Sequence, residues 1–110
     1  MAYDEDLADR IRVAIQEVPG VSEKKMFGGL AFLVGGHMAV SVSGKGGLMV
    51  RCDPAQTDAL CEHAGARPFE MRGRELDGWL RVDDDAVTSD EDLGRWVEIG
   101  AGHAQTLPPR

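Results

Sequence analysis

The hydrophobic pattern is clearest between residues 24 and 42. Leu30–Val34 is a short apolar run, typical of a strand, and Gly35-Gly36 follows it directly. A glycine pair between two such runs predicts a tight hairpin, because glycine accepts the positive φ that primed turns require. Residues 37–43 then alternate, which predicts a second strand. Its two predicted faces are Met38, Val40 and Val42 on one side, and His37, Ala39 and Ser41 on the other.

Three stretches carry the signals of helices. Residues 4–18 have apolar side chains at helical spacing. Asp53-Pro54 begins a second helix that runs to about residue 64, because proline at the first helical position loses no hydrogen bond. Ser89 is a capping residue in front of a third helix. The inner faces predicted for the first and third helices are Leu7, Ile11, Ala14, Ile15 and Val18, and Leu93, Trp96, Val97, Gly100, Ala101 and Ala104, respectively.

The remaining strands are predicted at residues 21–27, 48–52, 66–71 and 76–82. The order of elements is therefore αβββ(β)αββα. Short strands joined by turns pair antiparallel, since a parallel pair needs a long crossover. We therefore predict an α+β fold of two layers, a mainly antiparallel sheet covered on one face by three helices. The predicted core comprises Phe27, Leu30, Phe32, Val40 and Val50, packed on Ile11, Ile15 and Trp96.

The chain has 110 residues, enough for one domain, residues 1–110, with a single core. No apolar run approaches the roughly 20 residues that cross a bilayer. The first six residues are polar and acidic, unlike a signal peptide. We therefore expect a cytoplasmic protein that does not contact a membrane. Its oligomeric state, monomer or homodimer, is left open.

The formal net charge is -7. A domain that holds nucleic acid by its phosphates is normally basic, because its affinity comes largely from displaced counterions. The charge therefore argues against direct DNA binding and favours a protein, with basic proteins among the candidates, as the molecule that this domain recognises.

The chain offers little that resembles a catalytic or metal site. Its glycine clusters lie between predicted strands, whereas phosphate-binding loops join a strand to a helix, so we assign them to turns. Cys61 and His63 would point about 200° apart on a helix, which prevents joint metal binding. Cys52 precedes the second helix, but buried cysteines more often act as small apolar side chains. We predict reduced cysteines, and no catalytic residue, metal or cofactor.

Trp79 lies among arginines that no structural role explains. Alternation puts Trp79 and Arg81 on one face of their strand, opposite Leu80. Arginine and tryptophan dominate binding hot spots, because both offer large and rigid contact area. The alternative is that Trp79 packs beneath a helix. The candidate interaction surface comprises Arg51, Arg72, Arg74, Trp79 and Arg81.

Several segments, in order along nearly the whole chain, resemble the TfoX N-terminal domain family. They are residues 25–32 (Lys-Met-Phe-Gly-Gly-Leu-Ala-Phe), Met38-Ala39-Val40, Leu48-Met49-Val50-Arg51, Ala66-Arg67-Pro68-Phe69, Gly78-Trp79, Trp96-Val97 and Leu107-Pro108-Pro109. The resemblance implies the same α+β architecture and a bacterial regulator linked to natural competence. Such proteins are thought to act with a transcription activator, and the resemblance implies no reaction.

Two hypotheses of function follow. The first is a non-enzymatic, regulatory protein-interaction domain, a transcriptional co-regulator in the family's manner. Because this chain ends where larger family members continue into a C-terminal domain, we expect a stand-alone interaction module. The second is an enzyme or a small-molecule-binding domain that uses a cleft between the sheet and the second helix. An exposed apolar patch would favour the first, and a concave pocket with perturbed titratable groups the second.

Overall fold

The computed structural model describes residues 3–108 except residues 27, 45, 64 and 72. Two predictions, Phe27 in the core and Arg72 on the interaction surface, fall on residues outside this range. The helices are α1 (Glu5–Ala14), α2 (Thr57–Leu60) and α3 (Asp90–Gln105), with 3-10 turns η1 (Pro54–Gln56) and η2 (Asp84–Val87). The strands are β1 (Val21–Met26), β2 (Gly29–Val34), β3 (His37–Val42), β4 (Leu48–Arg51), β5 (Ala66–Met71) and β6 (Arg74–Val82).

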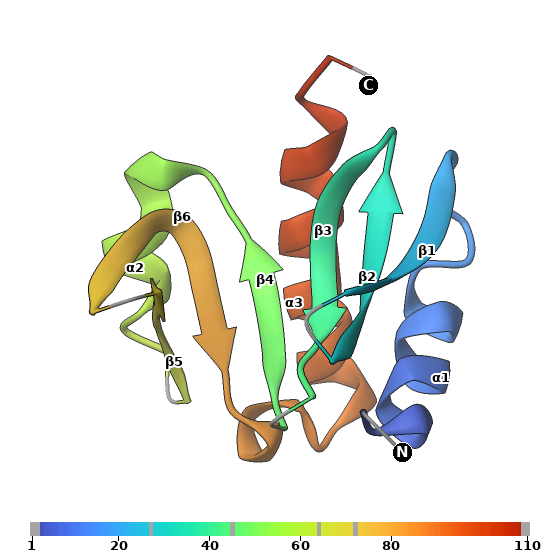
Figure 1. Cartoon of the computed structure of the whole chain (residues 1–110), viewed down its shortest axis with the longest axis horizontal. Helices are drawn as coiled ribbons and strands as arrows, with labels where there is room; N and C mark the ends of the chain where they lie inside the picture. The colour runs from blue at the N-terminus through green and yellow to red at the C-terminus, as the bar shows by residue number, and fades with distance from the viewer. Residues whose placement is uncertain (1–2, 27, 45, 64, 72, 109–110) are drawn as a thin grey trace.

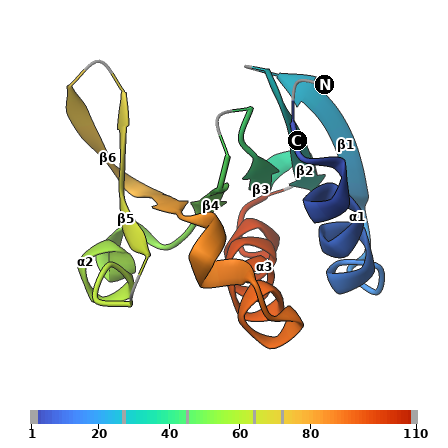
Figure 2. The ribbon, with the colours of Figure 1, turned by 90° about the horizontal axis from the view of Figure 1, so that it is seen from below.

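The six strands form one antiparallel sheet in the order β1-β2-β3-β4-β6-β5. The three helices lie on one side of it, with α3 packed across β3 and β4 and beside α1 (Figures 1 and 2). The predicted two-layer α+β fold is therefore confirmed. No helix in the described part of the chain is long and apolar enough to cross a membrane.

The core lies between the sheet and the helices. Phe32, Val40 and Val50 are fully buried there, in one cluster with Leu30, Ile11, Ile15 and Trp96. All six residues predicted for the inner face of α3 are buried. The predicted helix start also holds, because the Ser89 hydroxyl accepts a hydrogen bond from the Asp92 N–H at 3.1 Å.

The first two helices are shorter than the sequence predicts. α1 ends at Ala14, whose side chain is exposed, so its placement in the core is wrong. Ala8 lies on the opposite edge of the apolar face of α1, and it is buried, so the buried face of the helix is turned toward Ala8 and away from Ala14. The second helix is a 3-10 turn followed by a single α-turn, although Asp53 caps it as expected by accepting from the Ala55 N–H at 2.9 Å.

A β-bulge at Ala39 breaks the alternation predicted for β3. Phe32 pairs with Val40, but the next residue, Leu33, pairs with Met38, so Ala39 is an extra residue in its strand. Ala39 and Val40 are both buried. Gly100 of α3 approaches closely here, since a Cβ on it would lie 2.3 Å from the Ala39 carbonyl oxygen. The bulge moves Met38 away from the face that carries Val40, so the predicted common face is wrong for Met38.

Strand β6 bends at Gly78. Residues 77–79 have no partner in β5 in the described register, and Gly78 has a φ of 84°, which glycine adopts without strain. The Gly78 N–H donates to Thr57 Oγ1 at 2.8 Å and holds the bend against the second helix. Residues 69–71 of β5 and 74–76 of β6 therefore form a two-stranded hairpin, here called the arm, which stands away from the helical layer (Figure 2).

Candidate functional site

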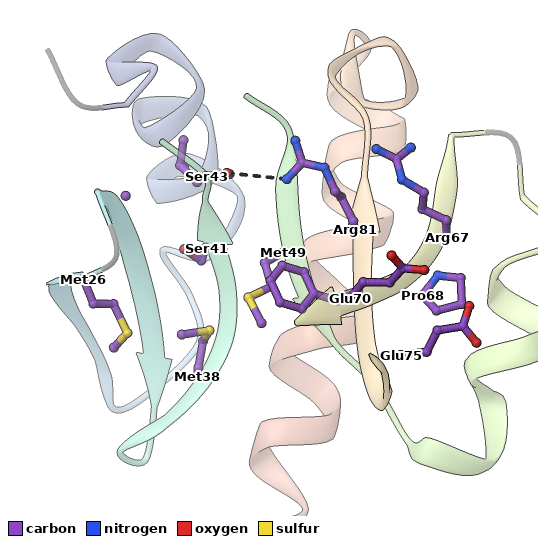
Figure 3. Close-up of a pocket in the computed structure, with 13 residues that line it drawn as sticks. Met26, Met38, Ser41, Ser43, Met49, Arg67, Pro68, Glu70, Glu75 and Arg81 are labelled. Atoms are coloured by element: carbon purple, nitrogen blue, oxygen red, sulfur yellow. Dashed lines mark hydrogen bonds between the residues drawn. The ribbon is translucent and has the colours of Figure 1, made fainter. Parts of the chain in front are cut away.

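The face of the sheet that the helices leave uncovered carries a cavity, here called the hollow. Its volume is about 710 Å³, which is in the range of small-ligand sites. All six strands contribute to its lining, and one side of it is the arm (Figure 3). The hollow is therefore a product of the bend in β6, which brings the arm over the outer face of the sheet.

This position differs from the cleft predicted between the sheet and the second helix. The hollow lies on the opposite face, and its lining residues belong to strands or directly follow one. Beneath the second helix the space is occupied, because Thr57 is buried and Leu60 and Cys61 pack against the core. A ligand held in the hollow would thus contact the sheet rather than the second helix.

Methionines form the floor of the hollow. Met26 of β1, Met38 of β3 and Met49 of β4 all line it and are half-buried (Figure 3). Phe69, also half-buried, adds an aromatic ring from the arm. Methionine is flexible and polarizable, so it adapts to apolar partners of different shape. The floor is therefore a soft apolar surface that is partly open to solvent.

Two arginines line the hollow, and both are engaged. Arg67 Nη1 donates to both carboxylate oxygens of Asp83 at 2.9 Å. Arg81 Nη2 donates to the Gly46 carbonyl oxygen at 2.7 Å, and Nη1 lies 3.5 Å from Ser43 Oγ (Figure 3). Arg81 therefore connects the turn between β3 and β4 to β6. The sequence pattern alone predicts Arg81 as a surface arginine without such a structural role.

Two glutamates of the arm line the hollow as well. Glu70 and Glu75 lie directly opposite each other in the β5–β6 register, and both are exposed. Like charges in directly opposed positions destabilise a sheet. Among the residues that the structure describes, neither glutamate forms an ion pair. The arm thus places two glutamates beside the methionine floor, although its sequence also holds Arg72 and Arg74, so that its formal charges balance.

Of the residues predicted as an interaction surface, the structure describes four, which lie at different points of β4 and β6. Arg51 and Trp79 are register partners at one end of β4 and β6, with the Arg51 guanidinium carbon 5.0 Å from the Trp79 ring centroid. Trp79 is half-buried. Arg81 lines the hollow, whereas Arg74 is exposed at the tip of the arm. Their role in binding stays a prediction.

Cys52 is buried and Cys61 is partly buried. Cys52 is 1% exposed, and burial raises the pKa of its thiol, although its contact with Thr57 Oγ1 at 3.8 Å opposes that shift. Burial, followed by the charge of Asp58, raises the pKa of Cys61. Both thiols are therefore protonated near neutral pH and are poor nucleophiles there.

Two histidine side chains make contacts in separate places. His37 is half-buried, with Nε2 2.6 Å from the Pro108 carbonyl oxygen. The His63 ring meets Trp96 edge-on at a centroid distance of 5.7 Å. Within the described ranges, no three His, Cys, Asp or Glu side chains gather as in a metal site.

The family of this chain follows from a match over most of its residues. A family model for the TfoX N-terminal domain matches residues 14–104. The chain belongs to this family. The match spans all the residues that line the hollow, from Met26 to Arg81. Comparison with curated proteins gives no match.

In this TfoX N-terminal domain, sequence reasoning missed the methionine floor and the two glutamates of the arm. The floor was hidden because the bulge at Ala39 changes the face on which Met38 lies. One available signal was Gly78, since an isolated glycine within a strand pattern indicates a bulge or a close backbone approach. If Gly78 is interpreted as a bend in its strand, the arm can be predicted from the sequence.

Proposed function

We propose that this domain is a non-enzymatic regulatory module that binds a protein partner through the uncovered face of its sheet. In this proposal the TfoX-type domain acts as a transcriptional co-regulator related to competence. The observation that carries the proposal is the hollow, whose half-buried methionines offer adaptable apolar surface. Arg51 and Trp79, stacked at the end of the same strands, extend the proposed contact area.

The charge of the domain supports a protein partner over duplex DNA. At a net charge of -7, the domain offers little counterion release on binding a phosphate backbone. Sub-micromolar binding to duplex DNA in a gel shift at about 0.15 M salt would contradict this part of the proposal.

Affinity capture from a lysate of the source organism, read by mass spectrometry, tests the proposal. Immobilised wild-type domain is compared with Met38→Asp, which places a charge on the floor of the hollow. Val13→Asp is the matched control, because Val13 is 66% exposed on α1 in the helical layer. A partner retained by the wild type and by Val13→Asp, but lost by Met38→Asp, supports the proposal.

The capture experiment also has an outcome against the proposal. Thermal melts first establish that Met38→Asp is folded, and Met26→Asp on the edge strand serves as a second floor variant. If every captured protein binds wild type, floor variants and control equally, the uncovered face is not the binding surface.

A second candidate function is the binding of a small apolar molecule. The volume of about 710 Å³ and the mainly apolar floor favour it. Native mass spectrometry of the domain, purified without denaturation, distinguishes small-molecule binding from the protein-interaction proposal. A discrete bound mass that disappears in Met38→Asp would support a small-molecule binder, whereas the protein-interaction proposal expects the mass of the bare chain.

A further inference from the structure

We infer that the methionine floor is a modification site, at which a peroxide oxidises the thioethers to sulfoxides and thereby lowers the affinity of the hollow for apolar groups. This inference rests on the proposed function and adds how binding at the uncovered face is regulated. It follows from the distribution of methionine between the hydrophobic core and the hollow.

Methionine is divided unevenly between the two faces of the sheet. All three methionines whose side chains the structure describes, Met26, Met38 and Met49, line the hollow (Figure 3). The core cluster on the helical face consists mainly of branched aliphatic and aromatic side chains, and none of its described members is a methionine. Packing of the core therefore does not account for the thioethers of the floor, and a change in their chemistry leaves the core contacts in place.

The thioethers of the floor are within reach of a small oxidant. They are half-buried and lie on the face opposite the three helices (Figure 2). The hollow, at about 710 Å³, admits molecules far larger than a peroxide. In the reaction with hydrogen peroxide, the sulfur gives an electron pair to one oxygen and the O–O bond breaks. The other oxygen leaves with both hydrogens as water, so the products are one sulfoxide and one water molecule.

Oxidation changes the floor from apolar to polar. A thioether is a weak acceptor on a flexible apolar chain, whereas a sulfoxide carries a strongly polar S=O group. An apolar occupant that covers this group buries it without a hydrogen bond, which is unfavourable. Because the methionines come from three strands, β1, β3 and β4, oxidation of any one of them places a polar group in the same floor.

The cysteines are less suited to oxidation by a peroxide. Cys52 is 1% exposed, and burial raises the pKa of both Cys52 and Cys61. The thiolate is the reactive form of cysteine, whereas a thioether has no proton to lose. Treatment with peroxide near pH 6, well below the ordinary thiol pKa of 9.0, therefore favours the methionines.

Oxidation of the folded domain by hydrogen peroxide tests the inference, with the uncharged dye Nile red as the probe of apolar surface. Peptide mass spectrometry locates the added oxygen atoms, and thermal melts establish whether the oxidised domain is folded. We expect sulfoxides at the floor methionines and an affinity for Nile red that is at least about fivefold lower than before treatment. Methionine sulfoxide reductases, which return the sulfoxide to the thioether, are expected to restore the affinity.

A variant with leucine at the three floor positions, Met26→Leu/Met38→Leu/Met49→Leu, is the matched control. Leucine is apolar and similar in size to methionine, but it has no sulfur to oxidise. The variant keeps the other sulfur-containing residues of the chain, Met1, Met71, Cys52 and Cys61. Each protein is compared with itself before and after peroxide, and the affinity of the variant for Nile red is expected to change less than about twofold.

Several results would overturn the inference. The floor methionines stay reduced while free methionine in the same solution is oxidised, or their oxidation unfolds the domain. The oxidised domain binds Nile red as before, or the reductases do not restore its binding. The leucine variant loses as much affinity as the wild type. Finally, Nile red does not bind the wild type, or binds Met38→Asp equally, which would show that the floor does not hold apolar groups.

The same measurements separate this inference from the proposed function. If a captured partner depends on Met38 but binds the oxidised and the reduced domain equally, the uncovered face remains the interaction surface and only the inference is wrong. If no captured protein depends on Met38, the proposed function is wrong. The Nile red measurements still decide in that case whether the floor is an oxidation site.

Discussion

The guanidinium group of Arg51 lies over the indole ring of Trp79, with its carbon 5.0 Å from the ring centroid. The two residues are register partners that join β4 to β6 next to the bend. A cation–π contact at a partly exposed site is worth about 0.5–1 kcal/mol. We therefore expect Arg51→Ala to lower the free energy of unfolding by about that amount.

A double-mutant cycle measures this contact directly. Urea melts of Arg51→Ala, Trp79→Leu and the double variant give the coupling between the two side chains. Arg95→Ala, which removes an exposed arginine whose ion pairs are long at 3.8 Å, serves as the control and should cost almost nothing. A coupling near zero would show that the stacking contributes nothing in solution.

Among the residues that the structure describes, Phe32 is the largest fully buried side chain. We expect Phe32→Ala to cost about 3–5 kcal/mol, because it removes a ring from the middle of the core and leaves a cavity. Val13→Ala, at a side chain that is 66% exposed, should stay within about 0.5 kcal/mol of the wild type. Urea denaturation measures both, and a loss below about 1 kcal/mol for Phe32→Ala would mean that the core can close around the missing ring.

Two glycines of α3 are expected to respond in opposite ways to alanine. Gly100→Ala would place a Cβ 2.3 Å from the Ala39 carbonyl oxygen, and such overpacking costs about 1–3 kcal/mol. Gly94 has no atom within 4 Å of the added Cβ, so Gly94→Ala should gain about 0.5–1 kcal/mol from helix propensity. Thermal melts of the two variants should therefore move in opposite directions, and a shared stabilisation would refute the close approach at Ala39.

The ion pair between Arg12 and Glu23 predicts a pH-dependent contribution to stability. Arg12 donates two hydrogen bonds to the Glu23 carboxylate, at 2.8 and 2.9 Å, and these lower the pKa of Glu23. The pair therefore stabilises the fold above the ordinary pKa of 4.5. That contribution is lost as the pH falls through the lower pKa of the folded state.

Comparison of Glu23→Gln with the wild type tests this dependence. Both side chains are more than a third exposed, so the pair is worth at most about 1 kcal/mol at neutral pH. The difference in unfolding free energy should shrink when the urea melts are repeated near pH 3. Glu98→Gln, at an exposed residue, is the control. An unchanged difference at both pH values would exclude a charged interaction as its source.

Local chemistry predicted much of this fold. The Gly35-Gly36 hairpin forms with positive φ at both residues, Ser89 caps α3, and the inner face of α3 is as its spacing indicates. Each of these features depends on residues near one another in the chain. Signals of this kind survive folding because tertiary contacts reinforce them.

The site was harder to predict, because it depends on two irregularities of the sheet. The bulge at Ala39 is coupled to the approach of Gly100, which is 61 positions away in the printed sequence. The bend at Gly78 is held by the Thr57 hydroxyl from a different element. The periodicity of one strand carries no information about either contact. It could therefore predict that Trp79 lies opposite Leu80, but it could not predict the hollow.

The bend at Gly78 also separates the domain into parts that can change independently. In the described sheet, residues 69–71 pair only with residues 74–76, while the pairing of β6 with β4 begins beyond the bend, at Trp79. A hairpin of another length or composition could therefore be grafted onto this scaffold without altering the register of the central strands. Exchange of that one short segment would give domains with a common core and different recognition, much as loops diversify on other rigid frameworks.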